Sequence, residues 1–289
     1  MIKLSYSGNE LYQRSPRAFF LHYYLKLRPT QIGSALMFGA SMDDGLNTLL
    51  LTKDLKQAKD AFLSAIDHFD YSGRILTLND AKFSKADNDQ SLWLPEDYNI
   101  HSKAYEYVTL RRKGLLMLDA YMEQVIPFID IVNVVQKKVE ITNQQGDMIR
   151  GVIDFIAKVN FPGFEGKTIL FDNKTSSIKY KPDSVKTSKQ LATYSEVPGS
   201  AHDLEGYIVL PKNFRKKKEP LIPIDIIIDK VEESTVESIF NEYDQTIKGI
   251  KAGNFPCTQD NCTKSPFPCP YFKYCKSDCS DTEGLDYYE

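Results

Sequence analysis

The sequence predicts an α/β protein with a central mixed β-sheet flanked by helices, an N-terminal helical region and a cysteine-rich C-terminal tail. Helical patterns dominate residues 1–125, and strand-length apolar segments alternate with turns and helices over 131–252. All five cysteines lie in the tail, residues 253–289. With 289 residues, of which 42% are hydrophobic, the chain can bury a sizeable core, and we expect one domain spanning 1–289.

The N-terminal region is predicted to form several helices. Residues 8–27 are typical of a short helix, a break at Pro16 and an aromatic-rich helix, and 34–50 of a longer helix. Residues 54–125 contain further helical segments around a polar loop that holds the single tryptophan, Trp93. We expect this region to cover the sheet and not to fold separately.

The central region is predicted to form the sheet. Its strand-like segments are short, apolar or alternating, and bounded by turn sequences such as NQQGD and FPGFEG. In chain order, we expect strands at 131–141, 149–160 and 167–173, a helix at 184–197, strands at 205–213 and 222–230, and a helix at 231–252.

Charge and hydropathy narrow the class of protein. The net charge of −3 argues against a non-specific nucleic-acid coat, but a local basic groove remains compatible with it. Basic pairs such as Lys137 and Lys138 would more often be a solvated face. The apolar runs are too short to cross a bilayer and the first residues do not resemble a signal peptide, so we expect a cytoplasmic protein without a membrane partner.

Charged residues interrupt the two most apolar strands. Asp154 lies inside GVIDFIAKV, and Asp172 and Lys174 end the strand TILFDNK. If the turn at 161–166 joins antiparallel strands, Asp154 and Asp172 approach each other, and a divalent cation such as Mg²⁺ would relieve their repulsion. An ammonium beside such an ion could orient water and stabilise charge on a phosphate. The alternative is a salt-bridged strand end beside an unrelated, hydrogen-bonded Asp154.

The next helix carries Gln190 and Tyr194 one turn apart, on the same face. Alone this pair is compatible with simple packing. The ordered set GVID, FDNKTS and QLATY, however, resembles the PD-(D/E)XK nuclease superfamily, in particular its RecB-like exonuclease branch. That branch follows the pattern G-x-x-D, D-x-K-T and Q-x-x-x-Y in this order.

The resemblance extends toward the N-terminus. The segment FGASMDDGLN is similar to the family's helical motif G-x-x-x-H-x-x-L-E, with Asp43 at the histidine position and Asn47 at the glutamate position. An aspartate there can still supply an oxygen ligand, which suits Mg²⁺ or Mn²⁺. The family's first motif matches at Ser5, Ser7, Pro16 and Tyr23 or Tyr24.

The resemblance implies a restriction-endonuclease-like core and a function. It implies that Asp154, Asp172, the carbonyl of Asn173 and Asp43 hold Mg²⁺ or Mn²⁺, that Lys174 positions the attacking water, and that Gln190 and Tyr194 hold the nucleic-acid backbone. The implied activity is a metal-dependent deoxyribonuclease, an exonuclease on single-stranded DNA or DNA ends, acting in repair, recombination or viral DNA processing. No helicase motif occurs, so a helicase would be a separate partner.

The aromatic helix AFFLHYYLKL offers stacking surfaces for bases, although core packing of Phe19, Phe20, Tyr23 and Tyr24 is the simpler explanation for most of these rings.

The crowded cysteines predict a metal site in the tail. CPYFKYC resembles the end of an iron–sulfur staple of RecB-like nucleases, which the family completes with a cysteine at the position of Ser15. We expect a self-contained site for a [4Fe–4S] cluster or a structural Zn²⁺, with Cys279 as the spare; the alternative is a lost staple. The expected ligands are Cys257, Cys262, Cys269 and Cys275.

Two rival functions remain at this level. The first is a non-catalytic nucleic-acid-binding or scaffold protein that retains the nuclease fold. The second is a zinc-binding interaction protein in which Asp-x-Lys is incidental.

Overall fold

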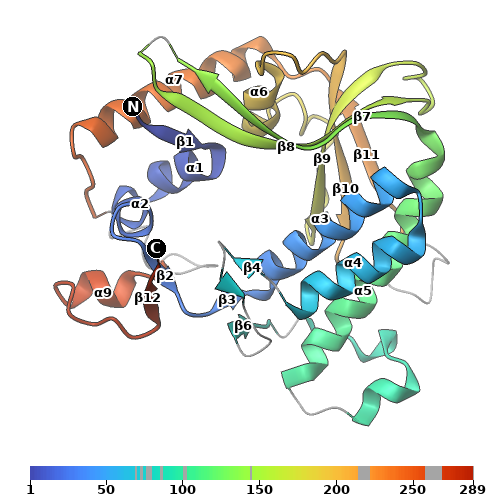
Figure 1. The fold of residues 1–289 in the computed structure, drawn as a ribbon. Coiled ribbons are helices and arrows are strands. Elements are labelled where there is room, and N and C mark those ends of the chain that lie inside the picture. Colours follow the sequence, from blue (N-terminus) through green and yellow to red (C-terminus); the bar gives the residue numbers. More distant parts are fainter. Residues whose placement is uncertain are drawn as a thin grey trace.

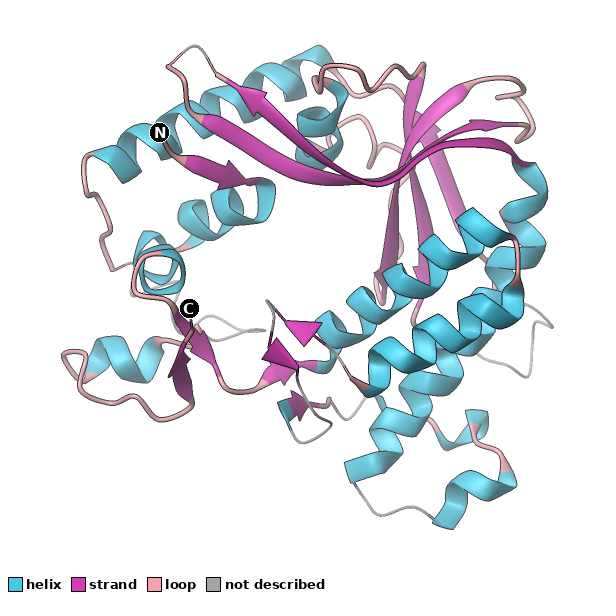
Figure 2. Cartoon of the chain, in the orientation of Figure 1, coloured by secondary structure: helices cyan, strands magenta, loops and turns pink. Residues whose placement is uncertain are grey.

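A computed structural model describes residues 1–68, 70–71, 74–75, 80–84, 87–99, 103–143, 145–213, 222–257 and 269–288. Its centre is a six-stranded mixed sheet, shown in Figure 1 and, by element type, in Figure 2. The strands are β1 (Lys3–Ser5), β7 (Ile129–Thr142), β8 (Met148–Val159), β9 (Thr168–Ser176), β10 (Leu204–Pro211) and β11 (Asp225–Asp229). Pairs β1/β8 and β9/β10 are parallel, whereas β7/β8, β8/β9 and β10/β11 are antiparallel. The expected mixed α/β fold is confirmed.

Helices pack against both faces of this sheet. In Figure 1, α1 and α2 lie beside β1, while α3, α4 and α5 lie below the far end of β7 and β8. The helices are α1 (Tyr6–Arg14), α2 (Pro16–Tyr23), α3 (Ser34–Thr52), α4 (Leu55–Asp67), α5 (Lys103–Gln124), α6 (Lys189–Ser195), α7 (Glu233–Lys251) and α9 (Phe272–Lys276). Short strands form three small ribbons: β2 (Leu27–Pro29) with β12 (Leu285–Tyr287), β3 (Ile32–Gly33) with β6 (Ala81–Lys82), and β4 (Asp70–Tyr71) with β5 (Arg74–Ile75). Short 3₁₀ turns occur at Gln90–Leu92, Pro95–Asn99 and Ile126–Phe128.

Two hydrophobic clusters cover the two faces of the sheet. Phe155 and Phe171 pack with residues of α3, α4 and α5 in the first cluster. Ile153 and Leu170 pack with α6 and α7 in the second, together with Leu4 of β1. The alternation of Leu170 and Phe171 between the clusters follows from the two-residue period of a strand. The N-terminal helices therefore share a core with the sheet.

One edge of β8 is divided between two strands. β7 pairs with β8 from Met148 to Val159 and so occupies one edge throughout. β1 pairs with residues 148–150 and β9 with residues 155–158. Since a strand has only two edges, β1 and β9 share the second edge. In the described chain, residues 151–154 therefore form an unpaired gap between them, which we call the edge gap.

The structure corrects several predicted boundaries. The predicted helix at 184–197 begins only at Lys189, because Ser188 caps it: its Oγ accepts the backbone N–H of Leu191 at 3.1 Å. The predicted break at Pro16, by contrast, is confirmed, because α1 ends at Arg14 and Pro16 is the first residue of α2. The strand β1 was not predicted at all, because three residues carry too little pattern. Among the described residues, no helix is long and apolar enough to cross a membrane.

Candidate active site

Asp154 lies at the end of the edge gap, where the pairing of β8 with β9 stops. The last paired residues are Phe155 and Phe171. One residue further, the backbone N–H of Asn173 donates to Oδ2 of Asp154 at 2.9 Å. A side-chain carboxylate thus takes the place of a ladder acceptor and joins the two strands as they separate. This contact holds the Asp154 side chain at the end of β9, next to the residue that follows Asp172.

Asp172, Lys174 and Gln190 form a closed set of contacts. The amide Nε2 of Gln190 donates to Oδ1 of Asp172 at 2.8 Å, and Nζ of Lys174 donates to Oε1 of Gln190 at 2.9 Å. Nζ of Lys174 also lies 2.6 Å from Oδ2 of Asp172 as an ion pair, and the Asp172 side chain is only 2% exposed. Gln190 therefore fixes the carboxylate and the ammonium relative to each other.

The short helix α6 holds Gln190 and Tyr194 over the edge gap. Tyr194 packs on Gly151 of β8, where an added Cβ would lie 2.5 Å from the tyrosine Cε1. Nε2 of Gln190 and the Tyr194 hydroxyl are 3.5 Å apart. The glycine of the G-x-x-D pattern is therefore required for the close approach of Tyr194 to the strand that carries Asp154.

Helix α3 brings a third carboxylate, Asp43, to the site. One turn earlier, Gly39 faces Thr175 of β9, whose Oγ1 would lie 3.8 Å from an added Cβ. One turn later, Asn47 accepts a long contact of 3.5 Å from Nε2 of Gln136 in β7. Positions 39, 43 and 47 share one helix face, so this face of α3 lies along the sheet.

Burial comes first, and repulsion between neighbouring carboxylates second, in the electrostatics of the site. Burial, followed by the charge of Asp172, raises the pKa of Asp43 to about 7. Burial and then the charges of Asp172 and Asp43 raise the pKa of Asp154 well above its usual value. Burial raises the pKa of Asp172, and Lys174 opposes that shift. The site therefore carries more negative charge than a single ammonium balances.

Lys174 remains an ammonium. Burial would lower its pKa, but the charge of Asp172 and the contact with it raise the pKa above the usual lysine value. A lysine that holds its proton so tightly can donate hydrogen bonds and stabilise an anion, but it is a poor general base.

The donor set fits a hard divalent cation. Oδ2 of Asp172 is buried and accepts no well-directed hydrogen bond within the described chain, and the neighbouring carboxylates repel one another. Carboxylate oxygens completed by water are the ligands that Mg²⁺ prefers. Among the described residues, no three His, Cys, Asp or Glu side chains already converge closely enough to hold an ion. Two carboxylates with water therefore match the site better than a cage made by the protein alone.

Several tyrosines around the site belong to no recognisable sequence pattern. The buried Tyr121 donates to the side-chain Oδ1 of Asn173 at 3.2 Å. Tyr207 stands beside Asp172 in the register of β10 with β9, and its ring meets Tyr180 edge to face at 5.2 Å. Burial raises the pKa of Tyr207 to about 12, so its hydroxyl keeps its proton and shares a hydrogen bond with Ser188. These rings close the site from three elements.

The aromatic helix contributes both to the core and to the surface. Phe19 is 4% exposed and packs within the second hydrophobic cluster, as simple core packing predicts. Tyr24, by contrast, is 47% exposed, and Tyr23 is half-buried.

The cysteine tail packs against α2 and β2. Cys269 and Cys275 border a small cluster that includes Leu21, Leu27 and Tyr274. Nη2 of Arg17 lies 3.7 Å from Sγ of Cys279, so the predicted spare cysteine is near the same site. Burial, with the neighbouring thiols, raises the pKa of the Cys275 thiol. Cys262 lies outside the described residues, and the described cysteines do not already converge as a metal site.

Ser15, which stands at the family's cysteine position, has a structural use. Its Oγ accepts the backbone N–H of Ala18 at 3.3 Å and caps α2.

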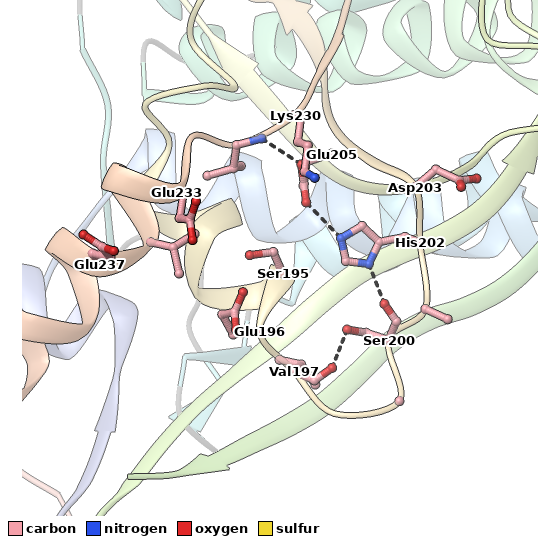
Figure 3. Close-up of a pocket in the computed structure, with 14 residues that line it drawn as sticks. Ser195, Glu196, Val197, Ser200, His202, Asp203, Glu205, Lys230, Glu233 and Glu237 are labelled. Carbon is pink, nitrogen blue, oxygen red and sulfur yellow. Dashed lines mark hydrogen bonds and ion pairs between the residues drawn. The ribbon is translucent and has the colours of Figure 1, made fainter. Parts of the chain in front are cut away.

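A second cavity, of about 890 Å³, lies at the other end of α6 (Figure 3). Its lining includes Lys230 and His202, whose imidazole contacts Oε1 of Glu205 at 2.9 Å and the carbonyl of Ser200. Its acidic lining residues are Glu196, Asp203, Glu205, Glu233 and Glu237. This lining repels phosphates, so the cavity is not an extension of the carboxylate site.

Comparisons with known proteins identify the family of the chain. The sequence profile described as the PD-(D/E)XK nuclease superfamily matches residues 3–276. A candidate exonuclease from Eubacterium rectale has a similar structure, with 11% identity and a TM-score of 0.46 over 92% of this chain and 90% of its own. A protein described as SSO0001 has 16% identity and a TM-score of 0.32 over 77% and 94%. A comparison with curated proteins found no match to the sequence. By the profile match over nearly its whole length, this chain belongs to the PD-(D/E)XK nuclease superfamily.

Proposed function

We propose that the protein is a Mg²⁺- or Mn²⁺-dependent deoxyribonuclease of the RecB-like branch, which hydrolyses phosphodiester bonds at single-stranded DNA or DNA ends. The observation that carries the proposal is the Asp172–Gln190–Lys174 set beside Asp154. A structural salt bridge at a strand end would not need a third side chain that holds both partners, nor two further buried carboxylates.

Each residue has a distinct task in the proposed reaction. Asp154 and Asp172 hold the metal, with the carbonyl of Asn173 and the Asp43 carboxylate as further ligands. When bound, the divalent ion supplies Lewis-acid activation of the phosphate and of water. Lys174 donates to the attacking water and to the charge that develops on phosphate oxygens. Gln190 holds the Lys174 ammonium and the Asp172 carboxylate in a fixed position relative to each other.

Tyr194 and Gln190 have a second proposed task, because both project from α6 over the edge gap. A hydroxyl and an amide at this position can donate to the phosphate oxygens of the strand that is cut. A helicase or recombination partner would supply unwound ends.

The cysteine tail has a proposed structural role. Cys257, Cys262, Cys269 and Cys275 would hold a [4Fe–4S] cluster or Zn²⁺ that fastens the tail to α2, since thiolates do not suit phosphate chemistry on Mg²⁺. Metal analysis and the visible spectrum of anaerobically purified protein decide between iron and zinc. A protein that contains neither metal contradicts this role.

The test is cleavage of end-labelled single- and double-stranded DNA, and of circular single strands, with Mg²⁺, Mn²⁺ or a chelator. We expect cleavage of linear single strands that requires the metal, and a loss of at least about 100-fold in kcat for Asp172→Asn and Lys174→Ala. The matched controls are Asp229→Asn and Lys186→Ala, because these residues form an exposed Lys–Asp pair of 3.5 Å away from the site.

Two results would count against the proposal. Equal activity of wild type and site variants with every metal contradicts the nuclease and supports the non-catalytic alternative, which predicts DNA binding without cleavage. Cleavage of circular strands as fast as linear ones contradicts exonuclease action.

A further inference from the structure

A small cavity of about 210 Å³ lies where β1, the start of α1 and the end of α2 meet β8. Lys3, Ser5, Tyr23, Tyr24 and Arg150 are among its lining residues. Gly8 forms part of the wall, and an added Cβ there would lie 3.1 Å from Oγ of Ser5 and 3.4 Å from the Tyr23 hydroxyl. Pockets for drug-sized ligands usually measure about 300–1,000 Å³. This cavity therefore accommodates one planar ring or one nucleotide, but not a duplex.

An exposed face of β8 connects this cavity with the active site. Ser5 pairs with Arg150, so β1 ends beside that residue. Side chains two residues apart point to the same face of a regular strand, which places Arg150 and Val152 on one face, and β8 leads from there to Asp154. Arg150 and Val152 are exposed, whereas Ile149 and Ile153 are buried on the opposite face. At about 3.3 Å per residue, Arg150 and Asp154 are roughly 13 Å apart along the strand.

This face is also basic. Lys138 of β7 pairs with Val152, so it stands on the same face, across β8 from the edge gap, and it is exposed. Lys3, Arg150 and Lys138 form no ion pair with any described residue, although Glu140 is the cross-strand neighbour of Arg150. Three unneutralised cations along one line suit a chain of phosphates better than they suit any neutral ligand.

An aromatic ring stands at the end of this line. Tyr24 lines the cavity and is nearly half exposed, while Phe20 stacks behind it with the ring centroids 5.7 Å apart. Phe255 also contacts the Tyr24 ring, with the centroids 5.5 Å apart, and the exposed part of the tyrosine can stack on a base of any sequence.

We propose that this face, which we call the β8 strip (Lys3, Tyr24, Lys138, Arg150 and Val152), binds a single-stranded segment of the substrate. The phosphates run along Lys138 and Arg150 toward Lys3, Val152 contacts a sugar or base, and one base enters the cavity against Tyr24. The inference rests on the proposed nuclease function and identifies its substrate as an unpaired strand that extends past the cleaved bond to β1.

The test is binding of a fluorescent single-stranded oligothymidine, measured by anisotropy in a chelator so that no cleavage occurs. The variants are Arg150→Ala, Lys138→Ala and Tyr24→Ala. Lys137→Ala is the matched control, since Lys137 precedes Lys138 on β7 and pairs with the buried Ile153 of the opposite face. Thermal unfolding checks that each variant folds.

We expect each strip variant to weaken binding about fivefold or more, while Lys137→Ala binds as wild type. The slope of log K against log salt should fall by about 0.7 for each lysine or arginine removed, and not for Tyr24→Ala. Arg150→Lys should restore most of the slope. With metal present, strip variants should raise KM and leave kcat nearly unchanged.

The outcomes separate this inference from the nuclease proposal. If the wild type cleaves DNA but Arg150→Ala and Tyr24→Ala bind DNA as tightly as the wild type, the proposal of the β8 strip is overturned. The nuclease proposal is then unaffected. Tight binding of a duplex together with weak binding of a single strand would also overturn the proposal of the β8 strip. Wild type that binds strands through the strip but never cleaves them supports the strip and contradicts the nuclease.

Discussion

The carboxylate of Asp154 accepts the backbone N–H of Asn173 at 2.9 Å, one residue beyond the last regular pair of β8 and β9. This contact fixes the point at which the two strands separate. It also keeps the carboxylate of Asp154 beside the end of β9, the strand that contains Asp172 and Lys174. The split between the strands and the spacing of the proposed catalytic residues therefore have one cause.

Gln190→Ala tests the contact that holds Asp172 and Lys174 together. Without the amide, the Asp172 carboxylate and the Lys174 ammonium remain but are no longer held in a fixed position relative to each other. We therefore expect kcat to fall about 10- to 100-fold with a smaller change in KM. Steady-state cleavage of a labelled single strand measures both constants. Thr193→Val on the same helix is the control, because the hydroxyl of Thr193 contacts Tyr243 and not the site. A wild-type kcat for Gln190→Ala would contradict this role.

Asp43→Asn should stabilise the metal-free protein. A carboxyl whose pKa rises from 3.8 in the unfolded chain to about 7 in the folded one destabilises the fold as pH rises through that interval. We therefore expect the metal-free wild type to lose stability between about pH 4 and pH 7, and the variant to lose less. Urea unfolding at several pH values in a chelator measures the difference.

Asp44→Asn is the matched control for Asp43, because Asp44 is the exposed neighbour on α3. With Mn²⁺ added, the order should reverse: the wild type gains stability from the metal and Asp43→Asn gains less. Equal effects of the two substitutions would show that Asp43 does not belong to the carboxylate cluster.

Gly151→Ala should disturb the packing of α6. The added methyl group would lie 2.5 Å from the ring of Tyr194, so the helix must move. We expect a loss of about 1–3 kcal/mol in the free energy of unfolding, together with reduced cleavage. Gly39→Ala is the contrasting variant, because its nearest neighbour would be 3.8 Å away and α3 would gain helix propensity worth about 0.5–1 kcal/mol. Chemical denaturation measures the free energy of unfolding of both variants, and equal values would contradict this packing role of Gly151.

The His202–Glu205 pair should make stability depend on pH. Burial alone would lower the pKa of His202, but the contacts with Glu205 and the carbonyl of Ser200 outweigh it, so the pKa is raised above 6.5. A raised folded pKa means that the stabilisation is complete below pH 6.5 and is lost as pH rises through the folded value. We expect His202→Gln to remove this dependence. If the free energies of unfolding of the wild type and His202→Gln change in parallel with pH across that interval, the pair does not have this effect.

The sequence predicted the parts of the site that lie on regular elements. Asp154, Asp172 and Lys174 could be placed because strand patterns are strong and turn signals separate them, and Gln190 because it follows on the next helix. Asp43 depended on the resemblance of FGASMDDGLN to the family's helical motif. The contact of Gln190 with both Asp172 and Lys174 could not be predicted, because it requires the position of α6 relative to β9.

Other features depend on contacts between distant segments. The pairing of Ser5 with Arg150 leaves no periodic signal in either segment, and so the β8 strip is invisible in the sequence. The start of α6 was misplaced because residues 184–188 have a helical composition while the Ser188 cap defines the true start. The neighbourhood of Cys279 and Arg17 likewise joins two ends of the chain.

The shared edge of β8 has a consequence for synthesis of the chain. β1 is made first, yet it can pair only after Arg150 has been made, and the edge gap is covered only after Tyr194 has followed. Closing so long a loop is entropically slow compared with forming α1 or α3. A nascent chain therefore cannot assemble the complete candidate site until Tyr194 has left the ribosome.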